Sequence, residues 1–232
     1  IKDLQTHFFT KAGVLKAVDG VSLEIKSGEI VGLVGESGSG KSITGFSIMG
    51  LVDAPGQIVG GQILFKGQDL AKLSPAEMQA YRGNRIAMIF QDPMMTLNPV
   101  LRIETQMVET ILSHDSSVSK VDAHARARDA LGLVGISSPD ERLRAYPHQF
   151  SGGMRQRVSI AIAMLNRPDL IIQKIGQARA GELRQRVADE VRTTFASSYA
   201  EEISLAQALD LDVLKTYALQ ATGQKYLVNP SL

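Results

Sequence analysis

The stretch IVGLVGESGSGKS, residues 30–42, decides the fold. Its first part, 30–34, is an apolar run that predicts a strand, and the residues after Ser42 follow a helical pattern. The helix is expected to place one apolar stripe on one face, formed by Ile43, Phe46, Ser47 and Met49. Between strand and helix stands the spacing G-x-x-x-x-G-K-S, made by Gly35, Glu36, Ser37, Gly38, Ser39, Gly40, Lys41 and Ser42. A strand, this loop and a helix in that order predict a phosphate-binding loop.

Each residue type in this loop has a chemical reason to be there. Glycines let backbone N–H groups converge on phosphate oxygens, and the N-terminus of the helix adds positive potential. Lys41 is expected to reach β- and γ-phosphates, and the Ser42 hydroxyl to ligate Mg²⁺. The alternative is a glycine-rich turn that binds nothing. The loop does not fit the dinucleotide-binding spacing G-x-G-x-x-G. Taken alone, it is compatible with kinases, GTPases, helicases and transporters.

The rest of the chain predicts an α/β fold. Residues 1–65 contain short apolar runs separated by glycine-containing turns, which is typical of strands. Further along, helical patterns alternate with short strands, and residues 114–120 read as a loop between two helices. The expected strands are Val21–Ile25, Ile30–Val34, Ile63–Phe65, Ile86–Phe90 and Leu170–Ile172, and the expected later helices begin at Ser74-Pro75, cover most of Glu104–Gly135, and run from Ser151 to Leu165.

Composition excludes several classes of protein. With 232 residues and 44% hydrophobic residues the chain can bury a core, so disordered and disulfide-stapled classes are out. Having no cysteine, it has no thiolate metal site, and this fits a reducing compartment. A net charge of +1 gives no general attraction to nucleic acid, and no apolar run approaches the ~20 residues of a membrane span. We expect a soluble protein whose first residues, before Ile1, are missing.

Two further segments bear on anion and metal binding. The sequence FSGGMRQR, residues 150–157, opens a helix with Ser151, Gly152 and Gly153, whose hydroxyl and amides could cap a second anion. Gln91 ends a strand and could meet Mg²⁺ or its water through its amide oxygen. Read singly, Gln91 is a strand-end amide that caps a turn, and Ser151 is an ordinary helix cap.

Three segments together resemble the nucleotide-binding subunit of ABC transporters, and among these the oligopeptide/dipeptide importer family. They are LKAVDGVSLEIKSGEIVGLVGESGSGKS (15–42), IAMIFQDPMMTLNPV (86–100) and RAYPHQFSGGMRQRVSIAIAMLNRPDLII (144–172). The resemblance covers residues 1–172. It implies an α/β, P-loop NTPase-type ABC nucleotide-binding core, 1–172, with a helical subdomain at about 100–160 that faces the transporter.

The resemblance also implies roles for single residues. Gly35–Ser42 would be the Walker A loop, and Gln91 would be the Q-loop residue that shares Mg²⁺ with Ser42. Phe8 would stack on adenine; Phe9 is the alternative, and a core phenylalanine is as good a reading for either. The signature loop, which closes over the nucleotide of a partner subunit, would comprise Ser151, Gly152, Gly153 and Gln156, with His148 as a turn residue before it.

The implied cofactors are ATP and Mg²⁺. The implied partners are a second nucleotide-binding subunit, identical or different, and transmembrane permease subunits, with no nucleic acid and no direct membrane insertion. The implied location is cytoplasmic, peripheral on the inner face of the cell membrane, and the implied activity is ATP hydrolysis coupled to peptide import.

The chain departs from the family after residue 172. Where the family has Ala-Asp-Glu-Pro, this chain has Gln173-Lys174-Ile175-Gly176. Lys174 would repel Mg²⁺ and Ile175 cannot orient water, so no catalytic residue is assigned and turnover near background is expected. The family's later H-loop histidine is also missing, because all four histidines precede residue 149. The string Ala188-Asp189-Glu190 reads as a solvated helix face rather than as a displaced catalytic strand.

Residues 173–232 predict an all-helical tail of unknown origin. Val187, Val191 and Phe195 follow one helical stripe, an order that an out-of-frame peptide rarely has. A fusion near Ile172/Gln173 is therefore the better hypothesis. It suggests a second function, a non-catalytic interaction protein made of a truncated core and a helical docking module.

Overall fold

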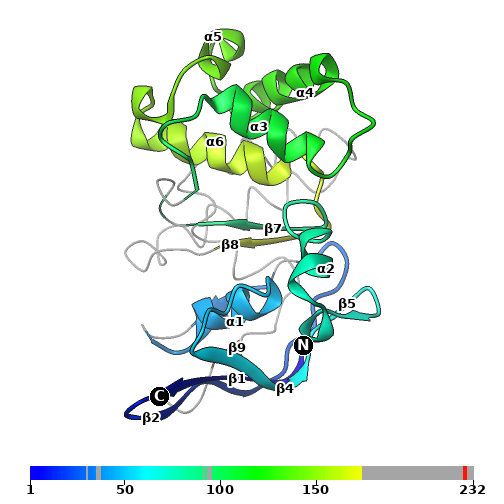
Figure 1. Cartoon of the computed structure of the whole chain (residues 1–232), viewed down its shortest axis with the longest axis vertical. Helices are drawn as coiled ribbons and strands as arrows, with labels where there is room; N and C mark the ends of the chain where they lie inside the picture. Colours follow the sequence, from blue (N-terminus) through cyan, green and yellow to red (C-terminus); the bar gives the residue numbers. More distant parts are fainter. Residues whose placement is uncertain (30, 35–37, 91, 93–95, 174–226, 229–232) are drawn as a thin grey trace. The chain divides into compact units, whose positions relative to one another are not determined.

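The structure is a computed structural model that describes residues 1–29, 31–34, 38–90, 92, 96–173 and 227–228 (Figure 1). The chain forms two compact units. Unit 1 comprises Ile1–Arg82 with Ala218–Leu232, and unit 2 comprises Gly83–Tyr217. The predicted α/β class holds in both, since each contains strands and helices.

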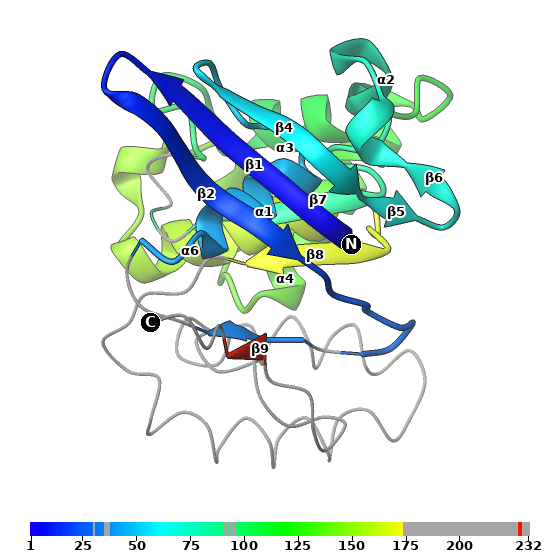
Figure 2. The same ribbon diagram turned by 90° about the horizontal axis from the view of Figure 1, so that it is seen from below.

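Unit 1 is built on a three-stranded antiparallel sheet of β1 (Lys2–Thr10), β2 (Gly13–Val21) and β4 (Gly56–Gln62), in the order β2-β1-β4 (Figure 2). Leu4 and Thr6 of β1 are fully buried, because alternate residues of a strand share one face. Gly20 stands outside the pairing of Leu4 with Val21 and Gln5 with Asp19, at a φ of 80°. It forms a bulge that a side chain would strain.

Helix α1 (Lys41–Ile48) contacts β1 and β2 of this sheet. Its buried residues are Thr44, Gly45, Ser47 and Ile48. The predicted stripe was therefore only partly right, because Ile43 and Phe46 are half-buried while Ser47 and Met49 are buried. The reason lies at the contact with β1, where the Ser47 and Thr6 hydroxyl oxygens are 2.8 Å apart. Small side chains allow this close approach, and apolar periodicity does not reveal it.

The other elements of unit 1 are short. β3 (Leu33–Val34) pairs in parallel with β9 (Leu227–Val228), and β5 (Leu64–Phe65) pairs with β6 (Gln68–Asp69). They are followed by the 3-10 helix η1 (Leu70–Lys72) and α2 (Pro75–Gln79). Ser74 caps α2 in a reciprocal capping box with Glu77, as the Ser-Pro start predicts.

One predicted strand in this unit was misplaced, and two others are shorter in the described structure than predicted. Val21 ends β2 and residues 22–26 are irregular, so the strand expected at Val21–Ile25 was wrong. In 30–34 only Leu33–Val34 is a strand among the described residues, and β5 starts one residue after Ile63. The apolar runs predict some of the buried positions. The limits of each strand depend on its pairing with neighbouring strands, which the runs do not reveal.

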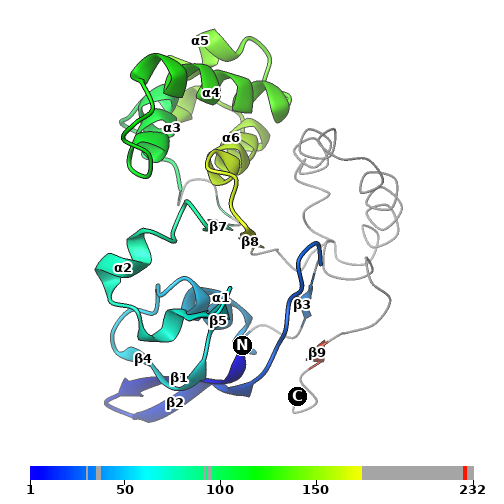
Figure 3. The same cartoon turned by 90° about the vertical axis from the view of Figure 1, so that its right-hand side faces the viewer.

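Unit 2 contains a parallel pair of strands, β7 (Ile86–Ile89) and β8 (Leu170–Gln173), and a group of helices (Figure 3). The helices are α3 (Ile103–Leu112), α4 (Lys120–Leu133), α5 (Pro139–Leu143), the 3-10 helix η3 (Pro147–Gln149) and α6 (Gly152–Met164). Their shared core includes Met107, Ile111, Leu131 and Ile160, all fully buried. The predicted helices, the loop at 114–120 and both strands are confirmed, and α5 was not predicted.

Most of the predicted tail, including Ala188-Asp189-Glu190, lies outside the described residues. The prediction of helix does not hold at three residues that are described. Gln173 is part of β8, where it pairs with Ile89, and Leu227–Val228 form β9. Gln173 extends by one residue the pairing with β7 that begins at Leu170.

Candidate functional site

The described part of the predicted phosphate loop is shaped by two glycines. Gly38 has a φ of 88° and Gly40 a φ of 84°, values that side chains rarely adopt. Gly40 is also the N-cap of α1, and a Cβ there would come well within 3.0 Å of the Ala17 carbonyl oxygen of β2. The loop can therefore turn into the helix only with glycine at position 40. Gly35, Glu36 and Ser37 lie outside the described residues.

Lys41 and Ser42 are the first two residues of α1. The Lys41 ammonium group donates a hydrogen bond to the Ser39 hydroxyl at 2.9 Å. No side chain caps α1 at Gly40, and its first turn carries no acidic residue. The helix N-terminus and the ammonium group thus present positive potential at one place, which fits the phosphate groups of a nucleotide.

The two candidate adenine-stacking residues lie on opposite faces of β1. Phe8 shares the face of Leu4 and Thr6 and is half-buried, while Phe9 is 47% exposed. A Cβ at Gly56 of β4 would come within 2.6 Å of the Phe8 ring. Gly56 therefore leaves the space that this ring occupies, a role that reading the sequence missed because the strand pairing was unknown.

The predicted signature loop opens α6. Ser151 is the N-cap, and its hydroxyl accepts a hydrogen bond from the Met154 N–H at 3.3 Å. Ser151, Gly152 and Gly153 are exposed, so the N-terminal N–H groups of α6 are accessible to an anion. Gln156 differs from the expectation, because its side chain is 2% exposed. It lies on the inner face of α6 and is not presented with the other three residues.

His148 is in η3, exposed, and its ring stacks on Tyr146 with ring centroids 5.7 Å apart. This arrangement fits the predicted turn residue and gives the imidazole no catalytic neighbour among the residues that the structure describes.

The positions at which the family resemblance predicts catalytic carboxylates come after β8 in the sequence. Ile89 of β7 is level with Gln173 of β8, so position 174 comes directly after the paired strands at their carboxyl ends. Gln91, Lys174 and Ile175 themselves lie outside the described residues. Within the described part of the chain, no group of three or more His, Asp or Glu side chains could hold a metal ion. Of the two predicted Mg²⁺ ligands, Ser42 and Gln91, the structure describes Ser42, which is half-buried on α1.

The family described as ABC transporter matches residues 18–173. The chain belongs to the ABC transporter family. Two curated relatives are dipeptide transport ATP-binding proteins DppD. The Bacillus subtilis protein is 49% identical over 173 residues, which are 74% of this chain and 51% of that protein. The Escherichia coli protein is 46% identical over 172 residues, 74% of this chain and 52% of that protein.

This ABC transporter chain thus spans about half the length of the curated relatives that it matches. Among solved structures, it resembles the ATP-binding cassette MJ0796, determined as a dimer in a post-hydrolysis state bound to ADP and Pi. The TM-score is 0.67 at 25% identity, over 93% of this chain and 84% of that chain. The helices in the described part of this chain include none that is both long and apolar enough to cross a bilayer.

Proposed function

We propose that this chain is the ATP-binding subunit of an ABC transporter that imports dipeptides or oligopeptides. The observation that carries the proposal is the loop before α1, where Gly38 and Gly40 have positive φ and Lys41 and Ser42 open the helix. It occurs in a chain that is 46–49% identical to two dipeptide transport ATP-binding proteins over 172–173 residues, 74% of its length. The loop geometry supports phosphate binding, and the relatives support peptide as the transported solute.

In the proposed site, Gly35–Ser42 hold the phosphates of ATP, with Lys41 at the β- and γ-phosphates. Ser42 and Gln91 hold Mg²⁺, which would neutralise charge on the phosphate oxygens when bound. Phe8 is the proposed adenine-stacking residue. Phe8 shares the face of β1 on which Thr6 contacts α1, the helix that follows the phosphate loop, and this supports Phe8 over Phe9 on the opposite face.

The proposed assembly contains two nucleotide-binding subunits and transmembrane permease subunits, at the cytoplasmic face of the cell membrane. Ser151, Gly152 and Gly153 of one subunit contact the nucleotide held by the other. Their exposure at the N-terminus of α6 supports this role, and the buried side chain of Gln156 is left out of the proposed contact. The helices of residues 100–160 form the proposed subdomain that faces the permease.

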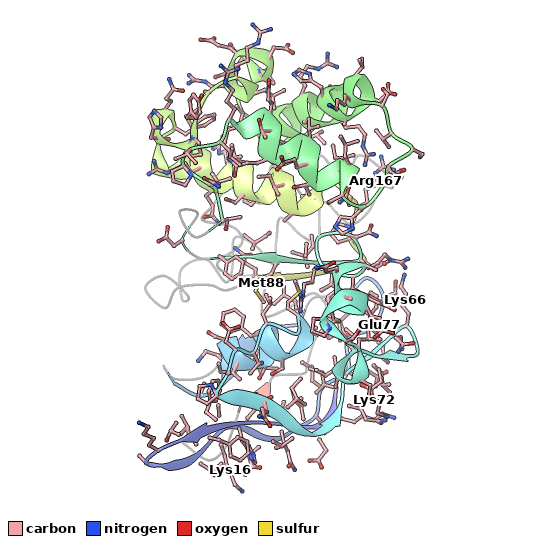
Figure 4. The ribbon with its side chains drawn as sticks, in the orientation of Figure 1. Lys16, Lys66, Lys72, Glu77, Met88 and Arg167 are labelled. Carbon is pink, nitrogen blue, oxygen red and sulfur yellow. The ribbon has the colours of Figure 1, made fainter. Side chains whose placement is uncertain are left out.

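Nucleotide binding tests this proposal directly. A fluorescent ATP analogue titrated into the purified full chain is expected to bind, and Lys41→Ala is expected to weaken binding by about tenfold or more, since a charge-assisted contact is lost. Lys16→Ala is the matched control, because Lys16 is an exposed lysine of β2 (Figure 4). Absence of binding by the unmodified chain, or equal losses in both variants, would refute the proposal.

A second candidate function is a non-catalytic interaction protein, in which the core binds nucleotide and residues after 173 dock a partner. It is favoured by one observation: the family match ends at residue 173, where the residues that follow are Lys174 and Ile175 in place of two carboxylates. A chain truncated after residue 173 should then lose partner binding and keep nucleotide binding. Full partner binding by the truncated chain would count against this candidate.

A further inference from the structure

Phe150 lies immediately before the exposed residues that open α6. It follows η3, precedes the N-cap Ser151, and has extended backbone at φ −107° and ψ 145°. Its side chain is 4% exposed and belongs to the core of unit 2. The conformation of Phe150 therefore fixes the direction in which Ser151, Gly152 and Gly153 leave that core.

Arg155, one turn into α6, ties the chain on both sides of the Phe150–Ser151 bond. Its backbone N–H donates to the Ser151 carbonyl oxygen at 2.9 Å, as the first turn of a helix requires. Its guanidinium Nη1 donates to the Phe150 carbonyl oxygen at 3.1 Å. That carbonyl is outside the helix, so no helical N–H is available to it.

Arg142, in the last turn of α5, contacts the side chain of Phe150, whereas Arg155 contacts its backbone. Its guanidinium carbon is 5.8 Å from the centroid of the Phe150 ring, in the range of a cation–π contact. The Nε–H groups of Arg142 and Arg155 are buried and donate no hydrogen bond within the described residues. Among those residues neither guanidinium is paired with a carboxylate, so their described contacts converge on Phe150.

We infer that Arg155, supported by Arg142, is a positioning residue of the signature loop. It holds Phe150 so that Ser151, Gly152 and Gly153 are directed at a phosphate of the nucleotide bound by a second subunit. The inference rests on the proposed function, and it adds two arginines that the three-residue signature does not include. It also gives the five-residue helix α5 a role, because Arg142 of this helix supports Phe150.

The test compares Arg155→Ala and Arg155→Lys with Arg157→Ala in the full chain. Arg157 is the matched control, because it is on the same helix and also donates to a carbonyl oxygen, that of Gly135 at 3.3 Å. Three quantities are measured for each protein: nucleotide affinity, nucleotide-driven dimerisation by analytical ultracentrifugation, and hydrogen exchange at residues 151–154, followed at Met154, whose N–H donates to the Ser151 hydroxyl.

Arg155→Ala is expected to weaken dimerisation about tenfold, the effect of one hydrogen bond from a charged donor, while nucleotide affinity changes less than about twofold. Exchange at 151–154 should accelerate. Arg155→Lys should recover part of both losses, since its ammonium can still donate a hydrogen bond. Arg157→Ala should match the unmodified chain in dimerisation and in exchange at 151–154.

Unchanged exchange at residues 151–154 in Arg155→Ala would overturn the inference, and this result does not depend on nucleotide. The inference would also be overturned if Arg155→Ala dimerised as strongly as the unmodified chain. It would be overturned, too, if the unmodified chain bound nucleotide without dimerising more strongly. An unmodified chain that binds no nucleotide refutes the proposed function, and with it the assigned purpose of Arg155.

Discussion

Gly40 has no room for a side chain, for two separate reasons. Its φ of 84° is strained for any L-residue, and a Cβ would collide with the Ala17 carbonyl oxygen of β2. Backbone cannot move aside as a flexible side chain can. Gly40→Ala is expected to lower the free energy of unfolding by about 3 kcal/mol, from strain plus displaced packing. Equilibrium urea unfolding followed by circular dichroism measures this loss.

Gly28 provides the control for that substitution. Its φ of 74° is similar, but nothing lies within 4 Å of the position that a Cβ would take. Gly28→Ala should therefore cost only the conformational strain, about 1 kcal/mol. Equal losses at positions 28 and 40 would show that the contact with Ala17 is unimportant.

Asp69 is a buried carboxylate of unit 1, and the fold lowers its pKa. Its burial favours the neutral form, but N–H groups of Ile63 and Ala71, at 3.1 and 3.2 Å, and the Lys72 ammonium, at 3.3 Å, outweigh burial. The pKa of Asp69 therefore falls below its ordinary value of 3.8. A lowered pKa means that the charged carboxylate stabilises the folded state above pH 3.8.

Asp69→Asn is accordingly expected to lower the free energy of unfolding by about 1 kcal/mol at pH 7. The difference from the unmodified chain should shrink as the pH falls below 3.8, because the unmodified chain then loses the same charge. Urea unfolding at pH 7, 5, 4 and 3 measures the trend. A difference that stays constant over this range would contradict the assigned pKa.

At the scale of elements, the contact of α1 with β1 depends on two buried hydroxyl groups. Ser47 donates to the Ile43 carbonyl oxygen at 2.7 Å, so Thr6 donates to Ser47 across the 2.8 Å between them. Ser47→Ala would leave the Thr6 hydroxyl buried without this acceptor, and is expected to cost about 2 kcal/mol. Urea unfolding measures it.

The double variant Thr6→Val/Ser47→Ala separates the hydrogen bond from simple packing. Replacing both hydroxyl groups removes the unsatisfied donor, so the double variant should be less destabilised than the sum of the two single variants. Additive losses would indicate that the two side chains contribute independently.

A comparison of α6 with α1 shows which features of a helix could be predicted from the sequence. Helix α6 has a serine cap, a mostly apolar inner face and a proline after its end, and its predicted limits, Ser151 and Leu165, are the observed N-cap and C-cap. Helix α1 has none of these signals, since its N-cap is a glycine and its buried face is partly polar. Local signals are in the sequence, whereas the residue that a helix meets on a strand depends on tertiary pairing.

For the candidate site the same distinction applies. The positive φ values at Gly38 and Gly40 agree with a motif that is local in sequence. The burial of Gln156, the space at Gly56 for Phe8 and the contacts of Arg155 with Phe150 are not local patterns, and none was predicted. The sequence therefore predicts which residues form the candidate site, but it does not predict which residues hold the described ones in place.

The last prediction concerns the whole chain, because ATP turnover needs carboxylates in addition to a phosphate loop. Positions 174 and 175 hold Lys174 and Ile175, so these two positions supply no carboxylate to order Mg²⁺ or to polarise water. Mg²⁺-dependent phosphate release by the full chain should stay at background, whereas Lys174→Asp/Ile175→Glu should raise it. Lys41→Ala in the double variant is the control for contaminating ATPase. Phosphate release by the unmodified chain that Lys41→Ala abolishes would show that hydrolysis proceeds without these carboxylates.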